Sequence, residues 1–503
     1  MPADVPAIPA AAPLPALVTE QVISADRLRQ RGAALLPEVL ADWSLLTPAG
    51  RGLALSGLPG TLVQLDGLRL TPAADGRVDL SLLPIAWLSG GGLVAGPAGA
   101  ALGAGSLAGT LDLSLADANS SHRAWAMAGA QAGQGIAGLD LRLGNAAGWV
   151  SAGFTQGGAL ATPAGLAAST QGRWHVGGRF TQAIGGAALS GRALFASRRD
   201  GPQRADHHDL AVQLQGGDAW RWQVALATGG HAADTGSSRQ TLLAARVHHT
   251  TGLVLPGAVD GIAVSLGTEA RRLRLGAARV GSQELHASAN VPLIQDRPAA
   301  EELRLELAWR QAWIAGRSEL LWSARGRWEF FPGVALRGGI ARGIDDLATQ
   351  DGIGRSIGLY LAPAIVPGFV ATIDWRHQSA GPARIRALDV AGFWRGRIGG
   401  TAQLTLEALA THHQQAELTP LPVARFQSVL RARLEDGGWA LLVGWRHRGT
   451  LAGEPARHWL DVGVERQLTD RVRLIASIGN AGDAGSTARP VGRQALLQLV
   501  AGL

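Results

Sequence analysis

The chain has no cysteine and no lysine among its 503 residues, and only one tyrosine. Without cysteine it forms no disulfide bond, no thiolate metal site and no cysteine nucleophile. All 46 basic residues are arginine, and they are dispersed instead of forming a basic run. The net charge of +7 is therefore weak evidence for a nucleic-acid partner, and we expect none.

Catalytic signatures are also missing. The sequence contains no glycine-rich phosphate loop followed by lysine, no HExxH motif and no GxSxG motif. We therefore expect neither an enzyme nor a cofactor. Apolar runs of about eighteen residues are absent as well, which argues against a membrane-spanning helix.

The composition leaves two hypotheses open. Charged residues make up only 17% of the chain and the mean hydropathy is +0.11, whereas about 25% charged residues is usual in soluble proteins. Such a chain is either a large, poorly soluble all-β protein or a transmembrane β-barrel. In a barrel, apolar residues alternate with polar ones and never form long runs.

Strict alternation from His122 to the end favours the barrel. Twenty-two alternating segments follow one another, the first near Arg123 and the last near Gly492. In "EELRLELAWRQ", the apolar positions Leu303, Leu305, Leu307 and Trp309 alternate with Arg304, Glu306, Ala308 and Arg310. The pattern predicts a 22-stranded antiparallel transmembrane β-barrel, with one residue set facing lipid and the other facing the lumen.

The spacing of the segments predicts short turns at one end of the barrel and longer loops at the other. The tight connections are 144–148, 182–186, 435–438 and 467–470. The longer ones are 157–171, 198–209, 345–354 and 411–422. Short periplasmic turns and longer outer loops are typical of outer-membrane barrels.

The first 120 residues lack the sustained alternation of the later segments. Residues 1–20 are rich in proline and alanine and predict an extended arm. Ser24 is a plausible N-cap for helical spacing over 24–43, which Pro37 divides into two short helices. Short strands are expected at "GLALSG", "TLVQLDGLRL", "VDLSLLP" and "GTLDLSL". Together they predict a small α+β unit.

This unit resembles the plug domain of TonB-dependent outer-membrane receptors. The similar segments, in the family's order, are "VISADRLRQRGAALLPEVL" (22–40), "VQLDGLRL" (63–70), "VDLSLLP" (78–84) and "GPAGAALGAGSLAGTLDL" (96–113). The plug residues matched by these motifs are Leu65, Asp66, Gly67, Gly96, Pro97, Gly103, Gly105 and Gly109. The strand 85–96 lacks the family's acidic and basic residues, and the expected outer loops are short. The chain therefore resembles a divergent, short-looped member of the family.

The resemblance implies a periplasmic arm at 1–20, a plug domain at 21–120 and a barrel at 121–503. It implies a monomer in the bacterial outer membrane, surrounded by the lipid bilayer, that imports a small chelate such as an iron–siderophore. Its energy would come from a TonB-type inner-membrane protein, with Leu17, Val18 and Thr19 as the candidate contact. The N-terminus is not a secretory signal as written, so the signal is expected to have been removed or to lie upstream of the given start.

Three histidine pairs are candidate ligands for a metal or a chelate. His207–His208 and His412–His413 are expected in outer loops, and His248–His249 near the periplasmic rim. In a strand, neighbouring side chains point to opposite faces, so a pair shares one ion only if it lies in a loop. Exposed histidines without a ligand are the alternative.

Two further groups have structural alternatives. The lumen-facing Arg304, Arg310, Arg325 and Arg327 could attract an anion, or they could pair with Glu306, Glu319 and Glu329. The tryptophans Trp309, Trp322, Trp328, Trp439 and Trp445 are expected at the membrane interface.

Two functional hypotheses follow. The first is energised import of a scarce ligand. The second is an uncoupled structural, anchoring or secretion-associated barrel that retains a vestigial plug. A soluble β-protein is the third interpretation.

Overall fold

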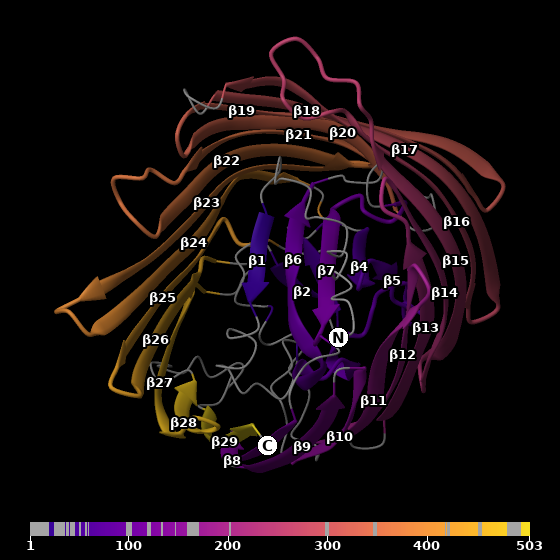
Figure 1. Cartoon of the computed structure of the whole chain (residues 1–503). Helices are drawn as coiled ribbons and strands as arrows, with labels where there is room; N and C mark the ends of the chain where they lie inside the picture. Colours follow the sequence, from indigo (N-terminus) through magenta and orange to yellow (C-terminus); the bar gives the residue numbers. More distant parts are fainter. Residues whose placement is uncertain are drawn as a thin grey trace.

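The computed structural model shows a closed barrel of antiparallel strands around a smaller five-stranded sheet (Figure 1). It describes residues 20–24, 36, 40, 46–49, 52–55, 58, 60–96, 103–117, 122–131, 134–145, 147–157, 171–200, 203–296, 301–345, 350–417, 419, 423–450, 455–479 and 494–502. The barrel consists of strands β8 to β29, so the predicted 22-stranded barrel is confirmed.

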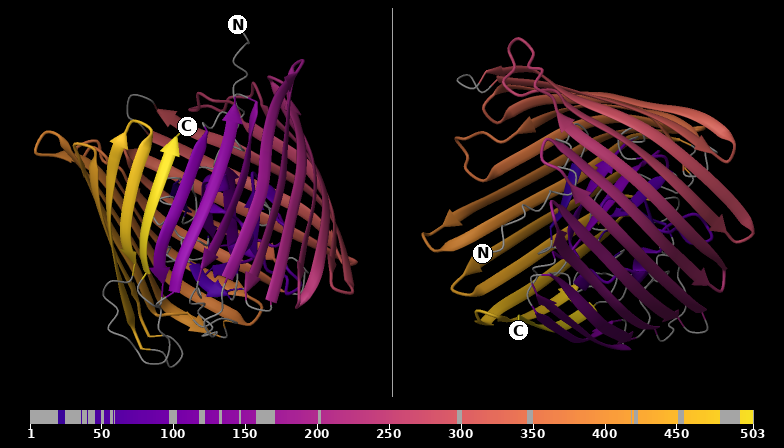
Figure 2. Two further views of the ribbon diagram at one scale, coloured as in Figure 1. Left: turned by 90° about the horizontal axis from the view of Figure 1, so that it is seen from below. Right: turned by 45° about the vertical axis from the view of Figure 1, so that its right-hand side comes forward.

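Each barrel strand pairs with the next along the chain, and β29 closes the barrel on β8. The strands run obliquely around the inner sheet (Figure 2). Their bounds are β8 Arg123–Gln131, β9 Gln134–Asn145, β10 Gly148–Gly157, β11 Gln171–Ile184, β12 Ala187–Asp200, β13 Gln203–Gly216, β14 Trp220–Ala233, β15 Gly236–Thr250, β16 Ala263–Leu275, β17 Ala278–Asp296, β18 Glu301–Ile314, β19 Arg317–Phe331, β20 Val334–Ile344, β21 Asp351–Leu361, β22 Phe369–Ala380, β23 Ala383–Ile398, β24 Ala402–Glu417, β25 Phe426–Asp436, β26 Trp439–Arg448, β27 Arg457–Thr469, β28 Val472–Gly479 and β29 Gln494–Gly502.

Alternation places apolar side chains outside and polar ones inside, as β22 illustrates. Ile373 is 42% exposed on the outer wall, while its neighbour Asp374 is 1% exposed on the lumen side. Arg376 lies on the same inner face and is 2% exposed. An apolar exterior around a polar interior is the pattern of a transmembrane barrel. Among the described residues, no helix has the length and hydropathy to cross a membrane.

The connections alternate in length only in part. We call the end where β8 begins and β29 ends the proximal rim, and the opposite end the distal rim. Six distal connections contain two residues each, at 132–133, 201–202, 234–235, 276–277, 315–316 and 381–382. The expected outer loop at 198–209 is therefore wrong, because β12 and β13 run through it. The proximal rim carries a long connection at 251–262.

The inner sheet has the order β1-β6-β7-β4-β5, and β4 pairs with β7 in parallel. Its strands are β1 Glu20–Ser24, β4 Thr61–Leu65, β5 Leu68–Arg69, β6 Leu88–Ala95 and β7 Gly109–Leu115, and a separate hairpin pairs β2 Leu46–Ala49 with β3 Gly52–Leu55. The strand expected at "VDLSLLP" is wrong. Asp79 accepts a hydrogen bond from the Ser81 amide and caps the 3-10 helix η1, Leu80–Leu82, and η2, Ile85–Trp87, follows it. Most of the helical segment expected at 24–43 lies outside the described residues, although Leu36 and Leu40 are helical and buried.

One apolar core joins the inner sheet to the barrel. Leucines of β4 and β7 pack in a single cluster with Trp87. The cluster continues into the wall through Trp149, Leu194 and Ile385. The lumen is therefore occupied by a domain whose hydrophobic core is completed by the wall itself.

Candidate functional site

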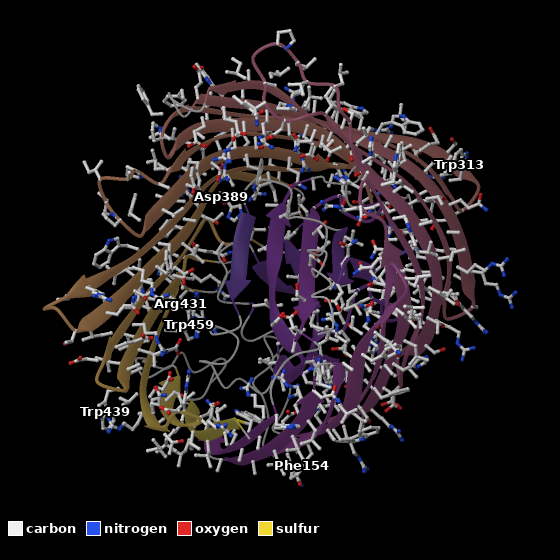
Figure 3. All side chains as sticks on the ribbon, in the orientation of Figure 1. Phe154, Trp313, Asp389, Arg431, Trp439 and Trp459 are labelled. Carbon is white, nitrogen blue, oxygen red and sulfur yellow. The ribbon has the colours of Figure 1, made fainter. Side chains whose placement is uncertain are left out.

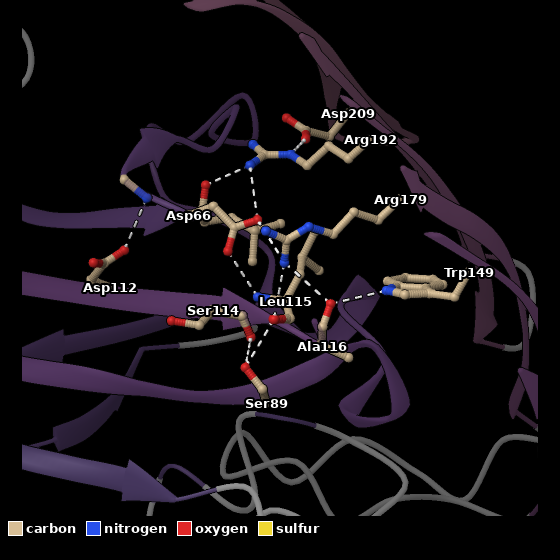
Figure 4. A network of polar contacts seen from close by, with 12 residues as sticks. Asp66, Ser89, Asp112, Ser114, Leu115, Ala116, Trp149, Arg179, Arg192 and Asp209 are labelled. Atoms are coloured by element: carbon tan, nitrogen blue, oxygen red, sulfur yellow. Dashed lines mark hydrogen bonds and ion pairs between the residues drawn. The ribbon is translucent and has the colours of Figure 1, made fainter. Parts of the chain in front are cut away.

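The turn between β4 and β5 is held by hydrogen bonds to β7 (Figure 4). Asp66 and Gly67 have φ angles of 51° and 74°, as a two-residue turn of type I′ requires. The Asp66 amide donates to the Leu113 carbonyl at 2.8 Å. In return, the Leu115 amide donates to Asp66 Oδ1 at 3.0 Å. The turn and the end of β7 therefore form one rigid unit.

Two arginines of the barrel wall bind this unit. Arg192 donates from Nε to Asp209 Oδ2 and from Nη1 to the Leu65 carbonyl, both at 2.6 Å. Arg179 Nη1 lies 3.7 Å from Asp66 Oδ2 and donates to the Leu115 carbonyl at 3.3 Å. The tip of the inner sheet is thus bound to β11, β12 and β13 by charged groups in a largely buried setting, where such contacts are strongest.

Asp112 lies beside the same turn on β7. Burial raises the pKa of Asp112 to about 6, and the charge of Asp66 acts in the same direction. The hydrogen bond from the Gly67 amide to Asp112 Oδ1, at 3.4 Å, opposes this shift. The strand beside the turn therefore carries a carboxyl group, that of Asp112, which takes up a proton in mildly acidic solution.

A second anchor joins β5 to β16 and β17, and the loop after β6 to β17. Arg69 Nη2 donates to Glu284 Oε1 at 2.8 Å, and Arg310 Nη1 donates to Glu284 Oε2 at 2.7 Å. The Ala104 amide also donates to Glu284, at 3.2 Å. Gly103 has a φ of 120°, and a Cβ there would collide with the Arg69 guanidinium. The glycine therefore allows the loop to approach this buried ion pair.

A third anchor forms at Asp79, which caps η1. Arg198 Nη2 donates to Asp79 Oδ2 at 3.4 Å, and His231 Nε2 lies 3.7 Å from the same oxygen. Burial acts to raise the pKa of Asp79, but the neighbouring His231 and the charge of Arg198 hold it below its ordinary value. This loop is thereby fixed to β12 and β14 near the distal rim.

The lumen wall of β24 to β28 carries a network of ion pairs with tryptophan among them. Arg431 and Trp459 lie on its inner side (Figure 3). Arg431 donates to Glu407 at 3.0 Å, and Arg446 Nη2 lies 3.4 Å from Asp461 Oδ2. Arg446 also lies 5.4 Å from the centre of the Trp459 ring. A surface of guanidinium and indole groups suits an anionic, planar ligand.

The predicted lumen arginines occupy the expected inner face. Arg310 and Arg325 are buried there, and Arg325 lies opposite Glu306 in the strand register. Arg327 Nη2 lies 2.9 Å from Glu329. Pairing with acids of the wall therefore accounts for part of this set. The predicted interface tryptophans Trp309, Trp328 and Trp439 are exposed on the exterior.

The histidine pairs do not lie in loops, which corrects the prediction. His207 and His208 are in β13, and His412 and His413 are in β24. His207 is buried in the lumen, while His208 stacks against Phe195 with ring centres 6.4 Å apart. Since neighbours on a strand face opposite ways, neither pair shares an ion. No group of three or more metal-binding side chains occurs within the described ranges.

The structure describes most, but not all, of the predicted plug residues. Gly96 donates to the Ala108 carbonyl at 2.9 Å and Gly105 to the Ile344 carbonyl at 3.0 Å. Gly109 has a φ of 144° and lies against Val94 of β6. Pro97 and the candidate TonB contact at 17–19 lie outside the described residues.

Sequence analysis missed the wall partners of the plug, above all Arg192, Asp209 and Glu284. The available signal was their inward parity within strands that alternate polar and apolar residues. Parity alone does not say which loop of the inner sheet each of them meets.

The fold and its anchors define a class: a barrel of outer-membrane type whose lumen is filled by an anchored N-terminal sheet. This is the fold of TonB-dependent siderophore receptors, as comparison with solved structures shows. No protein-family model and no curated protein matches the chain.

Three solved structures illustrate the likeness. The siderophore receptor PirA from Acinetobacter baumannii has a TM-score of 0.77 at 10% identity, over 96% of this chain and 98% of that one. The ferric-catecholate import receptor Fiu from E. coli K12 has a TM-score of 0.75 at 13% identity, over 96% of both chains. The siderophore receptor PirA from Pseudomonas aeruginosa has a TM-score of 0.73 at 12% identity, over 96% and 98%. At such identities the likeness establishes the fold.

Proposed function

We propose that the protein is an outer-membrane receptor that imports a scarce anionic chelate, an iron–siderophore by default. The observation that carries this proposal is the anchored sheet in the lumen. A barrel of this width would otherwise enclose an aqueous channel, and its plug is held by ion pairs of the wall with Asp66, Arg69 and Asp79. Such a gate suits controlled uptake and not free diffusion.

The proposed ligand class rests on the inner wall of the barrel and on solved structures that have the same fold. The solved structures of this fold are named for ferric enterobactin, siderophores and ferric catecholates. The inner wall at Arg446, Arg448 and Trp459 offers guanidinium groups beside an indole. Such groups bind anionic aromatic chelates by charge and stacking.

The proposal assigns one role to each segment expected from the sequence. Residues 1–20 serve as the periplasmic arm, 21–120 as the plug and 121–503 as the barrel of a monomer. The segment Leu17–Thr19 makes the contact with a TonB-type protein by strand addition. The plug motif residues keep the shape of the plug, and His207, His208, His412 and His413 have no assigned ligand.

Replacing Leu17, Val18 and Thr19 together by glycine tests the coupling. Cells expressing this variant should bind a radiolabelled ferric catecholate as the wild type does, yet fail to accumulate it. The matched control replaces Ala10, Ala11 and Ala12 of the same arm by glycine and should leave uptake unchanged. Equal uptake by wild type and variant, or none by either, would contradict energised import.

One observation favours the alternative, an uncoupled structural or secretion-associated barrel. The six two-residue connections leave the distal rim with few long loops for enclosing a ligand. On this hypothesis, the wild type itself neither binds nor accumulates the chelate, and its deletion affects envelope integrity instead.

A further inference from the structure

A row of arginines crosses three strands on the outer wall of the barrel. Arg239 of β15 lies directly opposite Arg274 of β16, and Arg274 lies directly opposite Arg279 of β17. All three side chains are exposed. We call these three residues the outer arginine row.

The row stands at the distal rim and faces outward. Arg239 has the same strand parity as Leu243, which is 52% exposed, and Arg279 the same parity as Leu285, which is 46% exposed. These leucines lie deeper along the same strands and belong to the apolar band. The arginines are thus fixed at the edge of that band, where lipid headgroups meet the hydrocarbon core.

The charges of the row are not balanced by acids. Arg274 Nε donates to the Gly276 carbonyl at 3.0 Å, and within the described part of the wall none of the three arginines forms an ion pair. The nearby Glu269 and Glu284 point into the lumen and bind Arg69 there. Like charges placed directly opposite each other destabilise a sheet. A bound anion would reduce the repulsion among these three arginines.

A second basic cluster at the same rim supports this interpretation. Arg355 and Arg386 lie directly opposite His377 on either side, in β21 and β23. Arg384 adds a third charge that acts on the same ring. Exposed tryptophans occur toward both rims, with Trp220, Trp328 and Trp439 near the proximal rim and Trp174 and Trp313 near the distal rim. Two clusters of outward-facing basic side chains thus lie at the distal edge of the apolar band.

We propose that the outer arginine row binds the phosphate groups of a membrane lipid in the leaflet around the distal rim. Directly opposite residues in a sheet are rooted about 5 Å apart, so two guanidinium groups reach one phosphate, and the third reaches a second phosphate on the same headgroup. Arginine matches phosphate oxygens with paired hydrogen bonds. The exposed leucines beneath the row contact the acyl chains, which free phosphate does not have.

Native mass spectrometry of the full-length protein in detergent tests the proposal. The probes are lipid A with two phosphates and the same lipid after enzymatic dephosphorylation. Wild type should bind the phosphorylated lipid about tenfold more tightly or better, since each charge-assisted contact is worth that much. The variant R239Q/R274Q/R279Q should lose this preference.

A control variant, R221Q/R397Q/R471Q, removes three exposed arginines that lie near the proximal rim and outside the lipid-facing wall, and it should keep the wild-type preference. Heat-modifiable migration on gels confirms that each variant is a folded barrel. The proposal is overturned if the distal variant keeps the preference or if wild type shows none. It is also overturned if inorganic phosphate displaces the lipid as effectively as added lipid A does.

Discussion

Arg192 on the barrel wall donates to the main-chain carbonyl of Leu65 at 2.6 Å, at the start of the plug turn. The same guanidinium donates to Asp209 of the neighbouring strand. A carboxylate of the wall thus orients an arginine that holds the plug by its backbone. This contact does not depend on which side chain stands at position 65, so the anchor survives substitutions at that position.

Replacing Arg192 by glutamine should loosen the plug turn without opening the barrel. The change leaves Asp209 buried without its charged partner, which typically costs about 3–5 kcal/mol. Hydrogen exchange at the amides of Gly67 and Leu70 should accelerate, while barrel amides such as those of β22 keep their protection. The double variant R192Q/D209N should recover part of the loss. An R192Q protein with unchanged exchange at the turn would contradict the assigned anchor.

Asp112 should make the stability of the turn depend on pH. Its pKa is about 6 in the folded protein against an ordinary value of 3.8. Between these values the folded state retains a proton that the unfolded state has released, so the contribution of Asp112 to stability falls as pH rises from 3.8 to 6. Above pH 6 the penalty is complete and amounts to as much as about 3 kcal/mol.

The variant Asp112→Asn should remove this dependence and protect the turn at pH 7.5. Asparagine keeps an oxygen that accepts from the Gly67 amide, so the geometry is preserved. Hydrogen exchange of the turn, corrected for the intrinsic rate at each pH, gives the opening free energy of both proteins. Parallel pH profiles for the two proteins would show that Asp112 is not the titrating group.

Replacing Gly103 by alanine should release the Glu284 anchor. The new Cβ collides with Arg69, which is held by Glu284 and has no room to move aside. Gly76→Ala is the matched control, because Gly76 also has a positive φ, of 81°, but has open space around its Cβ position. G103A should lower the protection of the Ala104 amide by about 2–4 kcal/mol more than G76A affects its own turn. Equal effects would mean that backbone strain alone matters at Gly103.

Local patterns were sufficient to predict the architecture. Period-two alternation predicted the number of barrel strands and the side on which each residue lies, because successive side chains on a strand must face opposite ways. The Asp66–Gly67 pair likewise predicted its turn, since few residues tolerate two positive φ angles in succession. Wrong predictions arose where residue types that favour turns, such as Gly201 and Pro202 in the sequence, made the polar ends of β12 and β13 resemble a loop.

The sequence by itself therefore determined the strands, their inner and outer faces and the turn at the tip of the plug. Only the tertiary structure decided which charges meet. Arg69 and Glu284 are 215 residues apart, and their contact depends on barrel closure and on the depth at which the sheet sits. The same holds for Arg239, Arg274 and Arg279, which become one row only through strand register. Parity is a local property of the backbone, whereas the partner of each charge is set by distances that only the closed barrel defines.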